Sequence, residues 1–380
     1  MIKRPFWINE IVKGWEKNPI VWLAGPRRIG KTTLCRMLEN DVLYLDCDLP
    51  SVEDMLKDPE VFFQDSKEKI IIFDEVHNLK DPSRILKIGA DMFSDKKILA
   101  TGSSTLAASR KFKDTLTGRK TVIKLLPVLC SELTLFGDIS LQKRFFHGGL
   151  PGALLSKIKE PSFYREWVES FFSRDMQKLF GFRDWEKFNL LFEYIMRKSS
   201  GLFDVSKTAS SVGMSRPTVA SHISALAITG AIYVLRPFFG GGKGELIKMP
   251  KIYGFDTGFV SFFKGWDVLR VSDYGILLEH LVLESLLAVN PYDRIMYWRD
   301  KQGREIDFVL QRTRDYIDIF ECKWNSEDFS PDAVKVFRKS YPGGENYLIY
   351  PGNASYRKMY KDISVKVLGI GELFNLGRMK

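Results

Sequence analysis

One stretch near the start of the chain has the residue types and the spacing that bind phosphate groups. Residues 25–32 read GPRRIGKT and match the pattern GxxxxGK[ST], directly after an apolar run and directly before a helical pattern. The glycines let backbone N–H groups turn inward around phosphate oxygens, and the positive end of the following helix adds to the attraction. Lys31 neutralises the β- and γ-phosphates, and the Thr32 hydroxyl ligates Mg²⁺. The stretch predicts a site for ATP and Mg²⁺ that includes Gly25, Arg28, Gly30, Lys31, Thr32 and Thr33.

Two adjacent acids further along the chain have the types that hydrolysis needs. The apolar run Ile70–Phe73 ends in Asp74 and Glu75. We expect Asp74 to hold the metal through water and Glu75 to polarise the attacking water. The next strand ends in small polar residues, of which Ser103 is predicted to sense the γ-phosphate. Taken singly, these motifs are also compatible with a glycine-rich turn and a strand that ends in acids, but their order and context favour a nucleotide site.

Alternating elements must position these residues. The runs Ile20–Ala24, Val42–Asp46, Lys69–Asp74 and Lys97–Thr101 read as strands separated by helical patterns. That alternation predicts an α/β fold with a parallel sheet and crossover helices. The predicted domains are an AAA+-like P-loop core (1–130), a helical lid (131–200), a winged helix-turn-helix (201–240), a linker (241–272) and a restriction-endonuclease-like α/β domain (273–380).

The first of these segments resembles a known family. The additional strand between the two nucleotide motifs is similar to that of AAA+ ATPases. The chain further resembles prokaryotic AAA-type ATPases with an uncharacterised C-terminal domain, and the resemblance spans essentially the whole chain. It rests on the segments Gly25–Leu34, Asp74–His77, Ala100–Ser104, Leu116–Arg119, Leu125–Leu133, His147–Pro151 and Ser173–Asp175. This resemblance implies Walker A and Walker B motifs at residues 25–32 and 70–75.

Basic residues are concentrated inside the predicted ATPase core. Eight lie between Lys96 and Lys124, whereas the net charge of the whole chain is +10. These residues either line a path for nucleic acid or neutralise bound phosphates and the acidic pair. Among them, Arg119 is a candidate for stabilising transition-state charge in its own site or across a subunit interface, with a surface ion pair as the alternative. His77 is expected to be a structural hydrogen-bonding residue.

Residues 204–219 have the spacing of a helix-turn-helix. A short helix breaks at Gly213, and a second begins with Ser215 as N-cap and Pro217 in its first turn. Arg216, Thr218, Ser221 and His222 are predicted to project outward, as in a recognition helix, and Ala231–Leu235 to form a wing. The pattern indicates either DNA binding or a lid that never touches DNA, and the outward face carries few positive charges.

The last segment resembles the PD-(D/E)xK nuclease core. Glu321 and Lys323 lie two apart on one predicted strand and therefore share a face, where Asp307 of the adjacent strand can join them. Asp307 and Glu321 are the predicted ligands of a divalent metal, with Lys323 positioning water and Glu279 completing the site; Glu284 is a second candidate for that helix carboxylate. The alternative is a structural or DNA-docking domain without catalytic activity.

Composition sets limits on the class of protein. With 45% hydrophobic and 27% charged residues, a disordered or fibrous chain is excluded. The four cysteines form no CxxC pair, and no apolar run is long enough for a membrane helix, so we expect a cytoplasmic protein without a membrane partner.

These features together predict a protein that binds and hydrolyses ATP and acts with DNA, another protein or a second copy of itself. One alternative is a metal-dependent DNA nuclease regulated by ATP. The other is a nucleotide-dependent interaction switch without catalysis.

Overall fold

The computed structural model describes residues 1–38, 41–102, 116–241, 249–290 and 294–376. The chain divides into two units. The first contains Met1–Leu126, Arg165–Arg183 and Ser224–Ala231, and the second contains Pro127–Tyr164, Asp184–Ile223 and Ile232–Lys380. Among the described residues, no helix is both long and apolar enough to cross a membrane.

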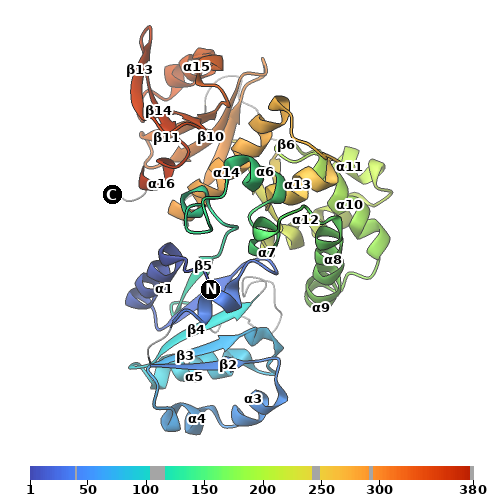
Figure 1. Cartoon of the computed structure of the whole chain (residues 1–380), viewed down its shortest axis with the longest axis vertical. Helices are drawn as coiled ribbons and strands as arrows, with labels where there is room; N and C mark the ends of the chain where they lie inside the picture. The colour runs from blue at the N-terminus through green and yellow to red at the C-terminus, as the bar shows by residue number, and fades with distance from the viewer. Residues whose placement is uncertain (39–40, 103–115, 242–248, 291–293, 377–380) are drawn as a thin grey trace. The chain divides into compact units, whose positions relative to one another are not determined.

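Five parallel strands form the sheet of the first unit, in the order β2-β3-β4-β1-β5 (Figure 1). They are β1 (Ile20–Ala24), β2 (Val42–Asp46), β3 (Ile70–Asp74), β4 (Lys97–Gly102) and β5 (Lys120–Lys124). The four strands expected from the sequence are present within one residue of their predicted bounds, whereas β5 was not expected. Every residue of β1 is buried, as expected for a parallel strand covered on both faces.

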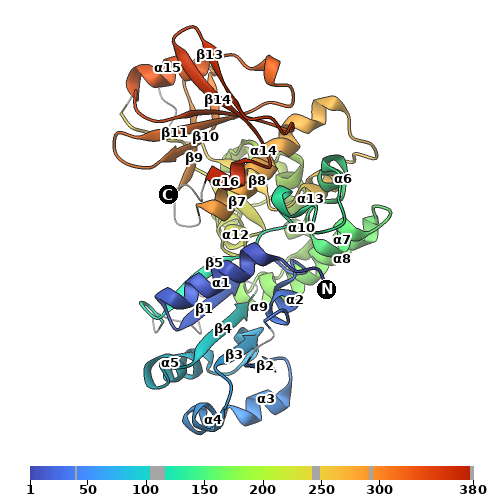
Figure 2. The same cartoon turned by 60° about the vertical axis from the view of Figure 1, so that its left-hand side comes forward.

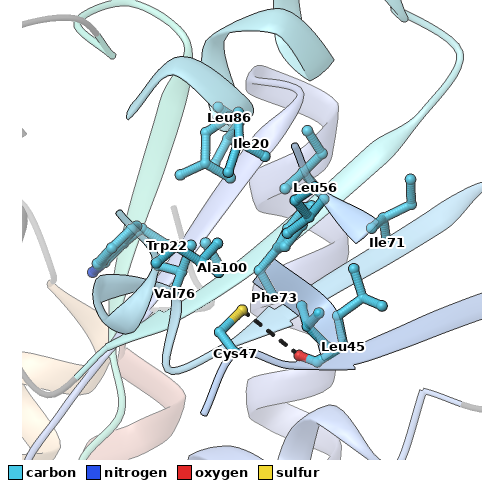
Figure 3. Close-up of a cluster of buried hydrophobic side chains, with 14 of the residues drawn as sticks. Ile20, Trp22, Leu45, Cys47, Leu56, Ile71, Phe73, Val76, Leu86 and Ala100 are labelled. Carbon is cyan, nitrogen blue, oxygen red and sulfur yellow. Dashed lines mark hydrogen bonds between the residues drawn. The ribbon is translucent and has the colours of Figure 1, made fainter. Parts of the chain in front are cut away.

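Helices cover both faces of this sheet. One face packs against α3 (Pro50–Met55), α4 (Pro59–Asp65) and α5 (Pro82–Met92), and the apolar core between them includes Trp22, Phe73 and Leu86 (Figure 3). On the other face lies α1 (Pro5–Lys17), where the Thr121 hydroxyl donates to the Gly14 carbonyl over 3.2 Å. The short helix α2 (Lys31–Cys35) follows the phosphate-loop motif.

A helical segment from the middle of the chain belongs to the same unit. It comprises the part of α8 (Pro161–Phe171) from Arg165 onward, a π-helical turn η5 (Phe172–Met176) and α9 (Gln177–Phe180). The sequence predicts this segment as part of a separate helical subdomain, 131–200. The structure differs because Arg165–Arg183 packs with the parallel-sheet unit.

The second unit contains a small three-stranded antiparallel sheet and the helices around it. Its strands are ordered β6-β8-β7, with β6 (Gly201–Leu202), β7 (Ile232–Leu235) and β8 (Lys251–Gly254). Helices α10 (Trp185–Arg197) and α11 (Val205–Ser211) precede α12 (Arg216–Ile228), whose N-cap Ser215 accepts from the Thr218 N–H over 3.2 Å.

Two expectations for this region were wrong. His222 does not project outward: only 6% of it is exposed, and its ring lies 6.3 Å from that of Phe188 on α10. The segment 241–272 is not simply a linker, because it contains β8 and α13 (Thr257–Phe263), both with buried residues. The intervening residues 242–248 lie outside the described part of the chain.

A six-stranded mixed sheet forms the end of the second unit, in the order β13-β14-β12-β11-β10-β9 (Figure 2). Its strands are β9 (Ile295–Arg299), β10 (Glu305–Gln311), β11 (Ile317–Cys322), β12 (Asn346–Tyr350), β13 (Tyr356–Tyr360) and β14 (Ile363–Gly369). The helices α14 (Val271–Val289), α15 (Asp332–Ser340) and α16 (Leu373–Leu376) accompany it, and α6 (Leu141–His147) and α7 (Pro151–Leu155) complete the unit. The two predicted strands that carry Asp307 and Glu321 correspond to β10 and β11.

Candidate functional site

The loop between β1 and α2 has the backbone that a phosphate-binding turn requires. Arg28 and Gly30 adopt positive φ angles of 58° and 99°. A side chain at Gly25 would begin 2.8 Å from the carbonyl oxygen of Leu125, so only glycine fits there. Lys31 is 6% exposed, and its ammonium donates to the carbonyls of Gly25 (3.0 Å) and Pro26 (3.3 Å). The lysine charge is therefore held inside the turn.

Asp74 is the last residue of β3, and its carboxylate accepts hydrogen bonds from three hydroxyl groups. Thr32 and Tyr44 donate to its Oδ2 over 2.7 and 2.6 Å, and Thr101 donates to its Oδ1 over 2.5 Å. Thr32 and Asp74, the predicted Mg²⁺ pair, thus lie within hydrogen-bond distance. Hydroxyl and carboxylate oxygens are ligands that Mg²⁺ prefers, so these residues fit that ion. Burial, followed by the bond to Asp74, raises the pKa of Tyr44, which keeps its hydroxyl protonated as a donor.

Glu75 turns away from the strand toward the lysine. It adopts a left-handed backbone with φ 53°, and its N–H donates to the Thr101 hydroxyl over 2.9 Å. Its carboxylate lies 3.9 Å from the Lys31 Nζ and 3.4 Å from the His77 Nδ1. One buried hydroxyl, that of Thr101, therefore contacts both members of the acidic pair. Left-handed backbone at a non-glycine residue costs about 1–3 kcal/mol and is concentrated at functional sites.

His77 stands beside Glu75 as a largely neutral group. Burial lowers its pKa, and the nearby carboxylates of Glu75 and Asp175 oppose that effect. A lowered pKa leaves the imidazole uncharged near neutral pH. Within the described residues, its Nδ1 has no hydrogen-bond partner, so the expected structural hydrogen bond is not seen at that atom.

Arg119 lies at the edge of the sheet opposite the phosphate loop. Its guanidinium donates to both carboxylate oxygens of Asp91, over 2.5 and 3.1 Å. Arg119 precedes β5, which pairs in parallel with β1 from Ile20↔Lys120 onward, whereas Gly25 follows the other end of β1. A strand of that length separates the two edges by about 16 Å. Its predicted role within its own site is therefore wrong, and the role across a subunit interface stays a prediction.

Other predicted contacts fall at the rim of the loop or outside the described residues. Thr33 is exposed on α2, and Arg28 lies 3.6 Å from the exposed Glu166. Ser103 lies outside the described residues, as do Arg110, Lys111 and Lys113 of the basic segment.

Two further lysines of the basic segment support the fold. Lys96 donates to the carbonyls of Ser66 and Glu68, and Lys97 donates to that of Trp15. These lysines cap the ends of neighbouring elements, which accounts for part of the concentrated charge without a nucleic acid.

Sequence reasoning missed two groups of residues at this site. One is Tyr44, whose strand β2 lies beside β3 in parallel, so that Tyr44 pairs with Ile72. The other is the segment Arg165–Arg183, where the Trp167 indole donates to the Arg27 carbonyl over 2.9 Å and Asp175 lies 3.5 Å from the Arg27 guanidinium. Strand pairing could have suggested Tyr44, but no spacing signal links Arg27 with a residue so far along the chain.

The acids of the C-terminal module come together, each with its own partner. Antiparallel pairing of β10 with β11 matches Phe308 with Phe320, so Asp307 and Glu321 are the next residues of the two neighbouring strands. Asp307 accepts from the Cys322 N–H over 2.8 Å, Glu321 lies 3.4 Å from Lys323, and Glu279 accepts from the Tyr253 hydroxyl over 2.8 Å. Burial, followed by the charge of Asp307, raises the pKa of Glu279 to about 8 and that of Glu321 well above its usual range.

This arrangement corrects part of the predicted metal site. Within the described ranges, no three His, Cys, Asp or Glu side chains are grouped so that they could hold a metal ion, so Glu279 does not complete a set with Asp307 and Glu321. Glu284 belongs to a different network, since it accepts from the buried Arg144 over 2.5 Å. Arg144 also donates to the Val128 carbonyl and the Thr257 hydroxyl, and this network ties the loop after β5 to α13 and α14.

Three segments of the chain match known domain families. Residues 17–134 match the AAA domain family, residues 139–270 match a domain of unknown function designated DUF8612, and residues 274–373 match one designated DUF4143. Uncharacterized proteins of Mycobacterium bovis and Mycobacterium tuberculosis are each 25% identical to the chain over 362 residues, which is 93% of this chain and 81% of theirs. A Walker-type ATPase of Pyrococcus abyssi aligns in structure with a TM-score of 0.45 and 14% identity, over 70% of this chain and 96% of its own. The chain therefore combines a segment similar to AAA domains, with the parallel α/β fold of P-loop proteins, and two segments similar to domains of unknown function.

Proposed function

We propose that this protein binds ATP with Mg²⁺ and hydrolyses it at the carboxyl edge of the parallel sheet. The observation that carries the proposal is the Thr101 hydroxyl, which donates to Asp74 and accepts from the backbone of Glu75. A single buried group thereby fixes a metal-holding carboxylate next to a water-polarising one. The match of residues 17–134 to the AAA domain family supports the same conclusion.

Each residue of the site has a separate task in the proposed reaction. Lys31 exchanges its bonds to the Gly25 and Pro26 carbonyls for oxygens of the β- and γ-phosphates. Thr32 and Asp74 hold Mg²⁺, which when bound neutralises phosphate charge. Glu75 polarises the water that attacks the γ-phosphorus, and the products are ADP and phosphate. The hydroxyls of Tyr44 and Thr101 keep Asp74 oriented throughout.

Two substitutions separate binding from hydrolysis. Lys31→Ala should abolish ATP binding measured by equilibrium dialysis with Mg²⁺. Glu75→Gln should retain binding but lower the turnover number about 100- to 10,000-fold, since it removes a general base while keeping the shape. Lys57→Ala, at an exposed surface position, serves as the control. Wild-type binding by the Lys31 variant would overturn the proposal, and binding without any wild-type turnover would favour the interaction switch.

DNA is the partner that we propose for the second unit. The order of α10, β6, α11, α12, β7 and β8 supports a helix-turn-helix with a β-wing. Exposed Lys207 and Arg216 flank the turn between α11 and α12. With so few cations on that face, the affinity must come from contacts spread over more of the molecule.

A metal-dependent nuclease is the second candidate function. The observation that favours it is the cross-strand pair Asp307 and Glu321 with Lys323 beside it, on strands that follow the helix α14. Two carboxylates can share a divalent ion while the lysine orients water.

Cleavage of plasmid DNA with Mg²⁺ or Mn²⁺ tests this candidate. The wild-type protein should nick the DNA, Asp307→Ala should not, and the exposed-acid control Asp328→Ala should nick it at the wild-type rate. Cleavage that is equal in the Asp307 variant comes from a contaminant and would remove the candidate.

A further inference from the structure

The segment Arg165–Arg183 makes two unequal ionic contacts with the phosphate loop. Glu166 lies 3.6 Å from Arg28, and their side chains are 60% and 41% exposed. Asp175 lies 3.5 Å from Arg27, and its side chain is only 1% exposed. The Trp167 indole bond to the Arg27 carbonyl holds the same part of the loop. Exposed ion pairs contribute little, whereas a buried carboxylate depends strongly on its partner.

One carboxylate oxygen of Asp175 is buried and can still accept a hydrogen bond. Within the described part of the chain, its Oδ2 has no hydrogen-bond partner, although the Arg27 guanidinium lies nearby. An oxygen in this condition costs about 1–3 kcal/mol, more when it is charged, unless a donor approaches it. Asp175 lies in the π-helical turn η5, a distortion that is frequent at functional sites.

The charge of Asp175 also acts on His77, the imidazole that lies beside Glu75. Burial lowers the pKa of His77, and the negative charge of Asp175 acts against that effect. The His77 Nδ1 lies 3.4 Å from the Glu75 carboxylate. Asp175 therefore contacts the phosphate loop through Arg27 and acts through its charge on His77 at the end of β3. Of these residues, only Asp175 lies outside residues 1–126.

We propose that Asp175 is a positioning residue for ATP hydrolysis, which holds Arg27 so that the phosphate loop reaches its working geometry beside Glu75. This inference rests on the proposed ATPase function. The guanidinium of Arg27 has five N–H donors, so it can contact Asp175 and a phosphate oxygen at the same time. ATP and the helical segment Arg165–Arg183 are thereby coupled.

Removing the charge of Asp175 should affect the reaction more than the binding of ATP. Misplacement of a supporting group by about 1 Å can cost about 100-fold in rate. For Asp175→Asn we expect the turnover number to fall about 10- to 100-fold while KM changes less than about threefold. Asp175→Glu should recover part of the rate. The matched control is Glu166→Gln, which removes the exposed ion pair of the same segment and should leave turnover within about twofold.

Hydrogen–deuterium exchange supplies a readout that is independent of turnover. Bound ATP should slow exchange in peptides covering residues 165–183 of the wild type and of the Glu166 variant, but not of the Asp175→Asn variant. Arg27→Gln tests the same contact from its other partner. Because the Arg27 side chain is 25% exposed, its substitution should impair folding less than a substitution of the buried Asp175. Arg27→Gln should reproduce the Asp175→Asn loss, and the double variant should be no worse than either single variant. Thermal unfolding verifies that each variant is folded.

The outcomes separate this inference from the function on which it rests. If the wild type neither binds nor hydrolyses ATP, the proposed function fails and this inference with it. If the wild type turns over ATP but Asp175→Asn behaves like Glu166→Gln, the function stands and the inference is wrong. Additive losses in the Arg27 and Asp175 double variant would also overturn it.

Discussion

Single hydroxyl groups determine the geometry of the nucleotide site. The Asp74 carboxylate accepts hydrogen bonds from three of them. One of these, the Thr101 hydroxyl, also accepts a bond from the Glu75 N–H. Thr101→Val, which replaces this hydroxyl by a methyl group, would therefore remove a hydrogen bond from each of the two acids. Lys31 and Thr32 were predicted from the spacing of the phosphate motif, and Asp74 from its place at the end of an apolar strand. Tyr44 was not predicted, since a tyrosine in an apolar strand has no motif.

Lys159 is a residue whose charge state changes near neutral pH. Its ammonium donates to the Ser261 hydroxyl over 2.6 Å and lies 4.2 Å from the Phe146 ring centroid. Burial lowers its pKa to about 7, against the opposing charges of Asp256 and Asp267. An unfolded lysine titrates near pH 10.4, so the unfolded chain holds a proton between about pH 7 and 10.4 that the folded chain releases. Stability from this group therefore rises with pH across that window and is lowest below about pH 7.

Lys159→Met tests this pH dependence. Methionine keeps the chain length but has no amine, so the variant should gain on the wild type at pH 6.5 and lose that advantage by pH 9.5. Thermal midpoints measured at both values give the difference, and Lys157→Met, exposed two residues earlier, should give parallel curves. A midpoint difference for Lys159→Met that does not change with pH would contradict the assignment.

At the scale of elements, local patterns predicted most of the parallel sheet. Strands β1 to β4 are short apolar runs between helical patterns, and a buried parallel strand has this composition. Strand β5 was missed because its sequence, KTVIK, alternates and ends in lysines. The break between helices α11 and α12 was predicted from Gly213 and Ser215, which act locally. Strand β8 and helix α13 were missed because glycines 240–244 suggested a loop that would continue.

Tertiary packing decided the remaining cases. His222 reads as polar and outward on a helical wheel, yet it fills the space beside Phe188. The proximity of Asp307 to Glu321 on neighbouring strands was predicted from two-residue periodicity, whereas the bond from Tyr253 to Glu279 was not. Long-range pairs of this kind leave no periodic signal in a single sequence. Asp175 is the extreme case, because its partner Arg27 lies in another segment of the chain.

At the scale of the whole molecule, the net charge of +10 fits a polyanionic partner and equally fits a solvated surface. Lys96 and Lys97 have structural roles, and Arg119 pairs with Asp91. The excess available to DNA is therefore smaller than the sequence count suggests.

ATP turnover measured with DNA over a range of salt tests that partner. We expect duplex DNA to stimulate turnover at low salt and the effect to fade as salt rises, because phosphate contacts release counterions. Substituting Lys207 and Arg216 together by alanine should reduce the slope of log affinity against log salt by about 2. Lys57→Ala is the control for charge loss elsewhere. Stimulation that is absent, or independent of salt, would argue against nucleic acid.

The first unit is built from three separate segments of the chain, which are synthesised at different times. Its segments end at Leu126, Arg183 and Ala231, so the sheet leaves the ribosome well before its last helical pieces. At about 5–20 residues per second, the 49 residues from Leu126 to Asp175 take about 2–10 s to make. During that time the nascent chain has Lys31 and Glu75 but lacks Asp175. If Asp175 positions the site as we propose, translation itself delays ATP hydrolysis until the later domains are being made.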